Sequence, residues 1–330
     1  MFNVGILLYE GCYLSSLSGP IDAFQIANAH IRNQQGQNAE HFCWKTVGLD
    51  LTPVKTSSGI VITPDSSISH TDTFDLIYIP AFCYEGMDSV RQLAKQLTPA
   101  LNWLTTAWQN GTKIGSNCTG TFILAESGLL DGREATTTWW LEKQFRKHYP
   151  KVKLTAKSIL TQQDNILCAG AMTAFQNMAV HLIEQHFSHE LAVQCAKAML
   201  IDISQTAQSP YQDLLIGEIS SDAVVAKAQY WLQTHLQRNI DLAELAKSMG
   251  LSQRTLIRRF KTELDQTPST YLQNIRVEAA KRLLENTVMP LPEVIEQIGY
   301  SDVSSFSKLF KQRTGLTPAG YRKRFASDES

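Results

Sequence analysis

The 330-residue sequence lacks the features of a secreted, membrane-spanning or metal-binding protein. Its six cysteines form no CxxC pair, which excludes typical zinc spacing and favours reduced thiols; they stand at positions 12, 43, 83, 118, 168 and 195. No stretch approaches the roughly 20 apolar residues needed to span a bilayer. The first residues, MFNVGILLYEG, contain no basic segment and no cleavage site. We therefore expect a cytoplasmic protein without a membrane segment, a metal or a cofactor.

The chain has almost no excess of one charge, because its net charge is −1 and only 18% of its residues are charged. The positive and negative residues are nevertheless unevenly distributed along the sequence. Residues 221–330 carry 16 Lys and Arg against 12 Asp and Glu, a net of +4. Residues 1–220 carry 14 against 19, a net of −5. The length and the 43% of apolar residues suit about two folded domains. A basic C-terminal third on an acidic body predicts contact with a polyanion at one end.

The first two hundred residues alternate strand-like and helix-like segments. Apolar runs predict strands at 4–8, 43–49, 59–63, 74–80 and 112–117, and a hairpin formed by 158–161 and 166–169. Strands that alternate with helices predict an α/β doubly wound, flavodoxin-like domain with a largely parallel sheet. Beyond a polar interval around Pro210, only helices broken by Gly and Pro follow. We therefore place a first domain at 1–203, a linker at 204–220 and an all-α domain at 221–330.

Proline and polar residues predict where several helices begin. Gly19-Pro20 is expected to open the first helix, because proline suits the first helical turn. Another helix is expected over 89–109. In the C-terminal domain, side chains that suit helix N-caps precede the apolar runs; these are Asp241, Ser252, and either Ser301 or Asp302.

Two segments of the C-terminal domain repeat each other. Gly250 recurs 49 residues later as Gly299, and after one inserted residue Phe260 recurs 50 residues later as Phe310. The other matched pairs are Glu244 with Glu293, Ser252 with Ser301, Lys261 with Lys311, Thr267-Pro268 with Thr317-Pro318, and Tyr271 with Tyr321. Each repeat consists of a short helix, a tight turn at Gly, a second helix and a Thr-Pro stop. This order predicts two helix-turn-helix motifs, which typically bind double-stranded DNA.

The second helix of each repeat has an apolar and a polar side. Leu256 and Phe260 fall on one side of the first such helix, and Phe306 and Phe310 on one side of the other. The opposite sides carry residues that suit base edges in a major groove; these are Arg254, Thr255, Arg258, Ser304, Ser305 and Lys308. Cations farther along are expected to contact phosphates; these are Lys261, Lys311, Arg322 and Arg324. A solvated basic face is the simpler interpretation of one such helix, but two copies in phase favour DNA binding.

The segment LAELAKSMGLSQRTLIRRFKTELDQTPSTYLQNIRVEAAKRLLENT, continued through GYSDVSSFSKLFKQRTGLTPAGYRKRF, resembles the DNA-binding domain of the AraC/XylS transcription regulators. The resemblance implies a double helix-turn-helix that binds asymmetric promoter sites as a monomeric module and contacts RNA polymerase. A connecting helix over 269–284, about 24 Å long, would let two recognition helices enter successive major grooves. One departure is Ile295, which stands where a small alanine is common, as Ala246 does in the first repeat.

Cys118 lies between a predicted strand and a helix that begins near Thr119, in the stretch KIGSNCTGTFILAESGLL. A residue on such a turn is expected to have an exposed side chain, and the helix N-terminus is expected to favour its thiolate. The stretch resembles the PfpI-like branch of the class I glutamine amidotransferase-like superfamily, as do LSSLSGPIDAFQIAN and GAMTAFQNMAVHL. A PfpI-like domain joined to an AraC-type domain is similar to the GlxA group of regulators.

The partners that a catalytic cysteine needs are missing at three expected places. The resemblance implies a histidine where Thr138 stands, a carboxylate near Ser15-Ser16 and a Gly-Gly loop at Ala81-Phe82. Without a base, an acid and oxyanion donors the nucleophile is not activated, so we predict a regulator and no enzyme. The alternative is a cysteine-dependent hydrolase or amidotransferase-like enzyme with Cys118 as nucleophile and a distant base; the candidates are His181 and His186.

The elbow is also a candidate pocket for a small molecule. A carboxylate or amide group would bind near the helix N-terminus; the expected lining is Ser16, Cys118, Thr119, Gly120, Thr138 and Trp139. Two other interpretations stay open, namely an inert elbow in a domain that only dimerises, and a DNA-binding protein without a ligand. The combined prediction is a bacterial-type transcription regulator, a homodimer through its first domain, that binds double-stranded DNA under the control of a metabolite.

Overall fold

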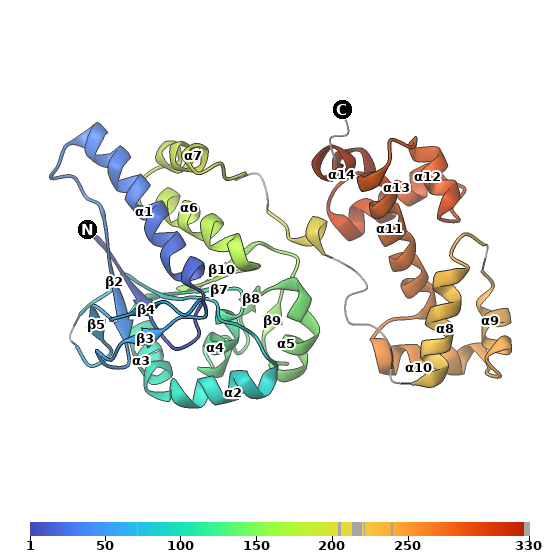
Figure 1. Cartoon of the computed structure of the whole chain (residues 1–330), viewed down its shortest axis with the longest axis horizontal. Helices are drawn as coiled ribbons and strands as arrows, with labels where there is room; N and C mark the ends of the chain where they lie inside the picture. Colours follow the sequence, from blue (N-terminus) through green and yellow to red (C-terminus); the bar gives the residue numbers. More distant parts are fainter. Residues whose placement is uncertain (71, 204–205, 213–219, 221, 239, 327–330) are drawn as a thin grey trace. The chain divides into compact units, whose positions relative to one another are not determined.

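The computed structural model describes residues 1–330 except 71, 204–205, 213–219, 221, 239 and 327–330. The chain divides into two units, Met1–Gln208 and Ser209–Ser330 (Figure 1). Of the predicted linker, 204–220, the residues 204–205 and 213–219 lie outside the described residues. In the described part of the chain, no helix is long and apolar enough to cross a membrane.

A seven-stranded sheet forms the centre of the first unit, in the order β10-β11-β7-β6-β1-β2-β5. Its strands are β1 (Phe2–Leu7), β2 (Phe42–Gly48), β5 (Ser66–Ser67), β6 (Leu76–Ile79), β7 (Lys113–Asn117), β10 (Leu160–Gln163) and β11 (Ile166–Ala169). Neighbouring strands are parallel except β10 and β11, which form the predicted hairpin. The prediction of a doubly wound, largely parallel sheet is confirmed. Because the chain order reverses beside β1, the carboxyl ends of β1 and β6 border the crevice where such folds bind ligands.

One predicted strand does not belong to this sheet. Within 59–63, only β4 (Val61–Ile62) is extended, and it pairs antiparallel with β3 (Val54–Lys55) in a separate hairpin. Gly59 has a φ of +85° and makes the turn between them. The edge of the main sheet is the two-residue β5, which is too short and polar to give a sequence signal. A second short pair joins β8 (Glu134–Ala135) to β9 (Lys153–Leu154).

Helices cover both faces of the sheet (Figure 1). One face carries three helices that pack on one another, α1 (Leu14–Gln35), α6 (Phe175–His186) and α7 (His189–Ala198). The other face carries α2 (Met87–Gln96), α3 (Thr98–Gln109) and α4 (Gly120–Glu126), and α5 (Glu142–His148) follows them in the chain. Helices on both faces are what a parallel sheet needs, because its strands are apolar on both sides.

Two predicted helix boundaries were wrong. α1 begins at Leu14, so Pro20 lies inside the helix and not in its first turn. The helix predicted over 89–109 is two helices that meet at Leu97. Pro99 explains this break, because proline fits the first turn of a new helix but not the interior of a continuous one.

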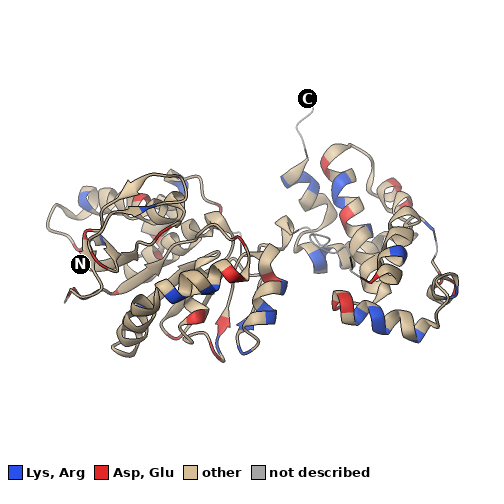
Figure 2. Cartoon of the chain, turned by 60° about the horizontal axis from the view of Figure 1, so that its bottom comes forward, with Lys and Arg blue, Asp and Glu red and all other residues tan. Residues whose placement is uncertain are grey.

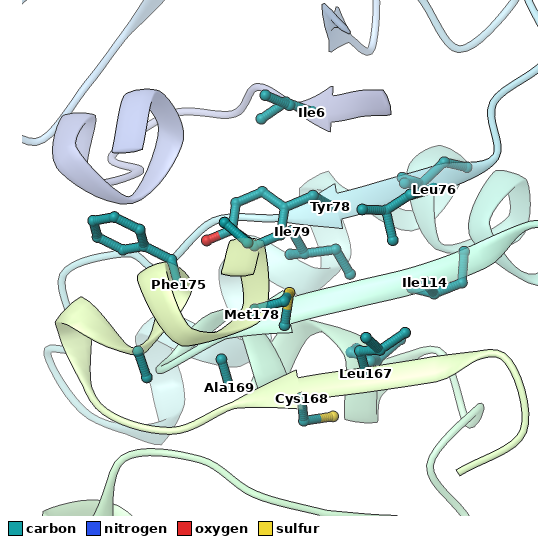
Figure 3. Close-up of a cluster of buried hydrophobic side chains, with 14 of the residues drawn as sticks. Ile6, Leu76, Tyr78, Ile79, Ile114, Leu167, Cys168, Ala169, Phe175 and Met178 are labelled. Atoms are coloured by element: carbon teal, nitrogen blue, oxygen red, sulfur yellow. The ribbon is translucent and has the colours of Figure 1, made fainter. Parts of the chain in front are cut away.

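The core of the first unit lies on both faces of the sheet, and Figure 3 shows the part of it beside α6. Ile6, Tyr78 and Ile114, from three neighbouring strands, are each at most 1% exposed. Met178 and Phe175 of α6 pack on the face that carries Ile6 and Tyr78, while the strand register places Ile114 on the opposite face. Burial of such a side chain contributes about 1.5–3 kcal/mol of hydrophobic free energy, so this layer holds the strand ends around Cys118 in place.

The second unit contains seven α-helices among its described residues, in two groups. They are α8 (Ala223–Thr234), α9 (Leu242–Ser248), α10 (Gln253–Leu264), α11 (Pro268–Asn286), α12 (Leu291–Gln297), α13 (Val303–Thr314) and α14 (Pro318–Phe325). One core joins α8, α9 and α10 to the first half of α11. The other joins α12, α13 and α14 to its second half. The predicted all-α arrangement with two helix-turn-helix motifs is confirmed.

Candidate DNA-binding surface and the cysteine elbow

Each helix-turn-helix motif is fixed by a glycine turn and a polar N-cap. Gly250 and Gly299 have φ angles of +70° and +77°, a region that glycine adopts without strain. The Ser252 hydroxyl then caps α10 by accepting from the backbone N–H of Thr255 at 3.2 Å. The Asp302 carboxylate caps α13 in the same way, with the N–H of Ser304 at 2.7 Å. The turn and cap place the first turns of α10 and α13 at matching positions of the two motifs.

The outer face of α10 carries the predicted DNA-contacting cations. Arg254, Arg258 and Lys261 are exposed and lie together on this face, and Figure 2 shows Lys and Arg spaced along the helix. Thr255 is half-buried and its hydroxyl contacts that of Ser252 at 2.9 Å, so it also supports the cap.

One arginine of α10 does not belong to this outer face. Arg259 is turned the other way and pairs with Asp222, the N-cap of α8, with 2.9 Å between Nη1 and Oδ2. Neighbouring arginines on α10 therefore differ in role, because Arg258 faces solvent while Arg259 fastens α8 to the motif.

The outer face of α13 carries fewer cations than that of α10 but has the same arrangement of exposed polar residues. Ser304, Ser305, Lys308 and Lys311 are all exposed, while Phe306 and Phe310 are fully buried. The Ser305 hydroxyl donates to Asp302 Oδ2 at 2.9 Å, so the N-cap already engages one of the predicted base contacts. The structure thus brings the two predicted stripes to the outer faces of two equivalent helices.

The sequence interpretation missed the first residue of each recognition helix. Gln253 and Val303 are 50 residues apart, like the matched positions from Phe260 onward, and both are exposed. N-terminal residues of a recognition helix contact base edges, where Gln pairs with adenine and an apolar group packs on the thymine methyl. The 50-residue offset was a sufficient signal, but an exposed Val303 could not be told from a core valine in the sequence.

The two arginines of α14 lie in different surroundings. Arg322 is turned inward, where its Nη2 donates to the Met289 carbonyl oxygen at 2.5 Å and its Nε is buried without a partner. The residue as a whole is half-buried, so the phosphate contact of Arg322 stays a prediction. Arg324 is exposed and lies over the Tyr211 ring at 5.4 Å, which leaves its phosphate contact a prediction.

Cys118 occupies a strained elbow but is not exposed. It connects β7 to α4 with a φ of +53°, which is unusual for a residue other than glycine. Its side chain is 2% exposed, and this burial raises the pKa of the thiol to about 11. The Thr119 backbone N–H and the Thr138 hydroxyl favour the thiolate and oppose only part of that shift. The expectations of an exposed sulfur and a favoured thiolate were wrong, because desolvation outweighs the few donors of the seven-residue α4.

Much of the predicted pocket around Cys118 is filled by protein. The Thr119 hydroxyl donates to the Phe82 carbonyl oxygen at 2.7 Å, and Ser16 Oγ accepts from the Ala81 N–H at 2.8 Å. A Cβ at Gly120 would lie 2.5 Å from the Pro80 carbonyl oxygen, so the loop over the elbow is in close contact with it. Of the six predicted lining residues, all but the half-buried Trp139 are buried. A cavity of about 230 Å³ in this unit lies elsewhere, between β10, α6 and α7.

The two candidate histidine bases contact residues other than those of the elbow. His181 lies 2.7 Å from Gln162 Oε1, and His186 lies 3.1 Å from Lys113 Nζ and against the Phe2 ring. Burial lowers the pKa of both imidazoles, with Lys113 adding to this effect. These contacts give both histidines structural roles on α6.

An α/β unit with a buried cysteine elbow, followed by two helix-turn-helix motifs with cationic outer faces, defines a class of DNA-binding regulators. A model of the DJ-1/PfpI family matches residues 3–185, and a model of the helix-turn-helix domain matches residues 245–324. The first unit has the fold of a Vibrio parahaemolyticus protein of known crystal structure, with a TM-score of 0.51 and 19% identity over 60% of this chain and 98% of that chain.

Curated relatives resemble almost the whole chain. The HTH-type transcriptional regulator GbdR of Pseudomonas aeruginosa is 26% identical over 326 residues, which cover 97% of this chain and 84% of that protein. CdhR, a regulator of the same organism, is 27% identical over 316 residues, 95% of this chain and 89% of that protein. The regulator GlxA of Rhizobium meliloti is 24% identical over 219 residues, 66% of this chain and 67% of that protein.

The chain belongs to the DJ-1/PfpI family, and its C-terminal unit carries an AraC-type helix-turn-helix domain. Both resemblances inferred from the motifs are confirmed. The chain is a DNA-binding transcription regulator, and its relatives are regulators and not the cysteine-dependent enzyme considered as an alternative.

Proposed function

We propose that this regulator binds asymmetric promoter sites by placing α10 and α13 in successive major grooves of one duplex. The observation that carries this proposal is that α10 and α13 expose polar residues at corresponding positions. Their opposite faces bury Phe260 and Phe310. α11, which joins the motifs, has 19 residues and is about 28 Å long at 1.5 Å per residue. That length suits recognition helices about one duplex turn, roughly 34 Å, apart.

The exposed residues divide into two kinds of contact. Those on the first two turns of α10 and α13 read base edges; they are Gln253, Arg254, Arg258, Val303, Ser304 and Lys308, with Thr255 and Ser305 beside them in the caps. Cations near the ends of the helices contact phosphates and fix the register without specifying sequence; they are Lys261, Lys311 and Arg324.

The first unit is proposed to sense a small metabolite with a carboxylate or amide group and to form a homodimer. Support comes from hydrogen bonds that join the elbow to the end of this unit. The Thr137 hydroxyl donates to the Cys118 carbonyl oxygen at 2.7 Å, and Gln208 Nε2 donates to the Thr137 carbonyl oxygen at 3.0 Å. Because Gln208 is the last residue of the unit, opening the elbow for a ligand would disturb the segment that leads to the DNA-binding motifs.

Footprinting of the promoter next to the protein's own gene tests the proposal directly. We expect the full chain to protect two DNA segments about one helical turn apart. We also expect the protein to act in the cytoplasm and to recruit RNA polymerase to this site. Extracts or panels of carboxylate- and amide-bearing metabolites should change the protection. If no genomic fragment shows salt-sensitive, sequence-dependent binding, the DNA-binding mode proposed here is wrong. If binding is unchanged across such a panel, the sensing role is wrong.

A further inference from the structure

A buried arginine joins three parts of the DNA-binding unit that are distant in the sequence. Arg276, in the middle of α11, is 9% exposed. Its Nε donates to the Leu236 carbonyl oxygen at 2.9 Å, and its Nη2 donates to the Arg238 carbonyl oxygen at 2.8 Å. Its guanidinium carbon lies 5.1 Å from the centre of the Tyr300 ring. The same side chain therefore contacts the residues that follow α8 in the first motif and the turn of the second.

The turn of the second motif packs directly on the residues after α8. A Cβ at Gly299 would lie 2.6 Å from the Leu236 carbonyl oxygen and 2.7 Å from that of Gln237. The equivalent Gly250 of the first motif has nothing within 4 Å of such a Cβ. Both glycines have positive φ angles, so both are required by their turns. Only Gly299 is also required by a neighbouring backbone.

Leu236 belongs to both hydrophobic cores of the unit. Its side chain packs against the core of the first motif and against the core of the second. Its carbonyl oxygen accepts from Arg276 in the same place. We call the contact formed by Leu236, Arg276 and Gly299 the Arg276 junction. It connects the two motifs by a route additional to the single helix α11.

The chemistry of this junction requires arginine. Two carbonyl groups, two residues apart, accept from separate nitrogens of one planar guanidinium, whose carbon lies over an aromatic ring. A guanidinium offers this forked geometry and stacks on aromatic faces, whereas an ammonium is a compact, strongly hydrated charge. Carbonyl groups that follow the C-terminus of α8 also carry partial negative charge toward the cation.

We propose that the Arg276 junction sets the distance and angle between α10 and α13, and so determines which spacing of half-sites this regulator accepts. α11 alone would let the motifs bend and twist about it, because each motif has its own core. Arg276 and Gly299 touch no base in this proposal and are positioning residues. The inference rests on the proposed binding of two half-sites on one duplex.

The test measures how affinity depends on half-site spacing. Fluorescence anisotropy is recorded with the full chain on duplexes that carry the footprinted site, the site with one or two base pairs inserted or removed, and each half-site beside scrambled sequence. For the unsubstituted chain we expect the paired site to bind at least about tenfold more tightly than either half-site, through effective concentration, and to lose most of that gain when the spacing changes.

Arg276→Met should remove this dependence. We expect its affinity for the paired site to fall about tenfold while each half-site keeps its affinity within about twofold, as for two loosely linked modules. The preference of Arg276→Met for the native spacing should also shrink. Arg276→Lys keeps the charge but not the forked geometry, so its spacing preference should lie between those of the unsubstituted chain and Arg276→Met. An Arg276→Met protein that keeps the native spacing preference, or loses half-site and paired-site binding equally, would overturn the proposal.

Gly299→Ala and Gly250→Ala form a matched pair that does not alter Arg276. Both introduce a Cβ at a positive φ, so both incur similar backbone strain, but only Gly299→Ala places it against the Leu236 carbonyl group. We expect a loss of spacing preference for Gly299→Ala alone, with circular dichroism confirming that both are folded. Equal effects of the two changes would contradict the inference. If the unsubstituted chain shows no spacing preference, the two-groove proposal fails first.

Discussion

The sulfur of Cys118 shows how burial can override a local motif. A strand-to-helix elbow with nearby donors favours a thiolate, yet the side chain is 2% exposed and the pKa of the thiol rises to about 11. At neutral pH the group is therefore protonated and a poor nucleophile. The backbone geometry of the elbow is nevertheless present, and the Cys118 carbonyl oxygen accepts a hydrogen bond from the Thr137 hydroxyl.

Alkylation should distinguish Cys118 from the exposed Cys83 of the same chain. With iodoacetamide at pH 7.5 we expect Cys83 to react first and Cys118 to remain largely unmodified. The raised pKa keeps the Cys118 thiol protonated as the pH rises above neutral. The rate at which Cys118 is alkylated should therefore still be increasing toward about pH 11. Mass spectrometry of the digested protein reads both sites. Rapid labelling of Cys118 at neutral pH would contradict the buried, protonated state.

Arg258 and Arg259 allow a comparison of neighbours on one helix. We expect Arg258→Ala to weaken binding to the specific site by about 1–3 kcal/mol and to relax sequence preference at one position, because a base contact is lost. Arg259→Ala should leave the sequence preference unchanged, since Arg259 pairs with Asp222. Binding titrations on the specific site and its single-base variants measure both. Equal losses on specific and random DNA for Arg258→Ala would remove it from the base contacts.

At the scale of elements, the two motifs reach the same arrangement with different residues. Ala246 and Ile295 stand at corresponding places in α9 and α12, and both are almost fully buried in their cores. The second core therefore accommodates the larger side chain at the position that departed from the family pattern. α10 and α13 also use different caps, a Ser252 hydroxyl in one and an Asp302 carboxylate in the other.

The cap of α13 should make the stability of the second motif depend on pH. The Ser305 hydroxyl and the N–H groups of Ser304 and Ser305 donate to the Asp302 carboxylate and lower its pKa. A lowered folded-state pKa means that the contribution is complete above the unfolded-state pKa and is lost as the pH falls through the folded-state value. Thermal unfolding between about pH 6 and pH 3 should show a smaller decline for Asp302→Asn, which keeps a capping oxygen. An unchanged decline would rule out this contribution.

A buried ion pair ties the segment after Ser209 to α11. Lys281 Nζ lies 3.0 Å from Glu278 Oε1 and donates to the Gln212 carbonyl oxygen at 2.6 Å, and both charged side chains are less than 10% exposed. We expect Lys281→Met to lower the free energy of unfolding by about 3–5 kcal/mol, because removal of one partner breaks a buried ion pair. The double change Lys281→Met with Glu278→Leu should recover much of this loss. Chemical denaturation measures both, and a harmless single change would contradict the pairing.

At the scale of the whole molecule, the charge distribution should govern the encounter with DNA. Residues 221–330 carry a net charge of +4 and residues 1–220 a net of −5, so we expect only the C-terminal part of the chain to attract a duplex. We expect the logarithm of the affinity to fall linearly with the logarithm of salt concentration, and Lys311→Ala to reduce that slope by about one while weakening all sequences alike. Titrations at several salt concentrations on specific and random duplexes measure this. An unchanged slope would remove Lys311 from the phosphate contacts.

Local patterns in the sequence determined most of the architecture. The alternation of strands and helices predicted the parallel sheet, and the matched residues from Glu244 to Tyr321 predicted both helix-turn-helix motifs. These signals are reliable because period, turn and cap depend on neighbours within a few residues. The outward orientation of Arg254, Arg258 and Lys308 followed from the same helical period.

Only the tertiary structure decided which polar groups are buried. Cys118 became inert, Arg322 turned inward and Arg276 joined two motifs, and each outcome depends on residues far away in the sequence. Desolvation and long-range packing have no local period, so the sequence carries no pattern that reports them. The sequence by itself therefore determined the class of protein and the exposed polar stripes of α10 and α13, while the fold decided the state of its cysteine and the junction between its motifs.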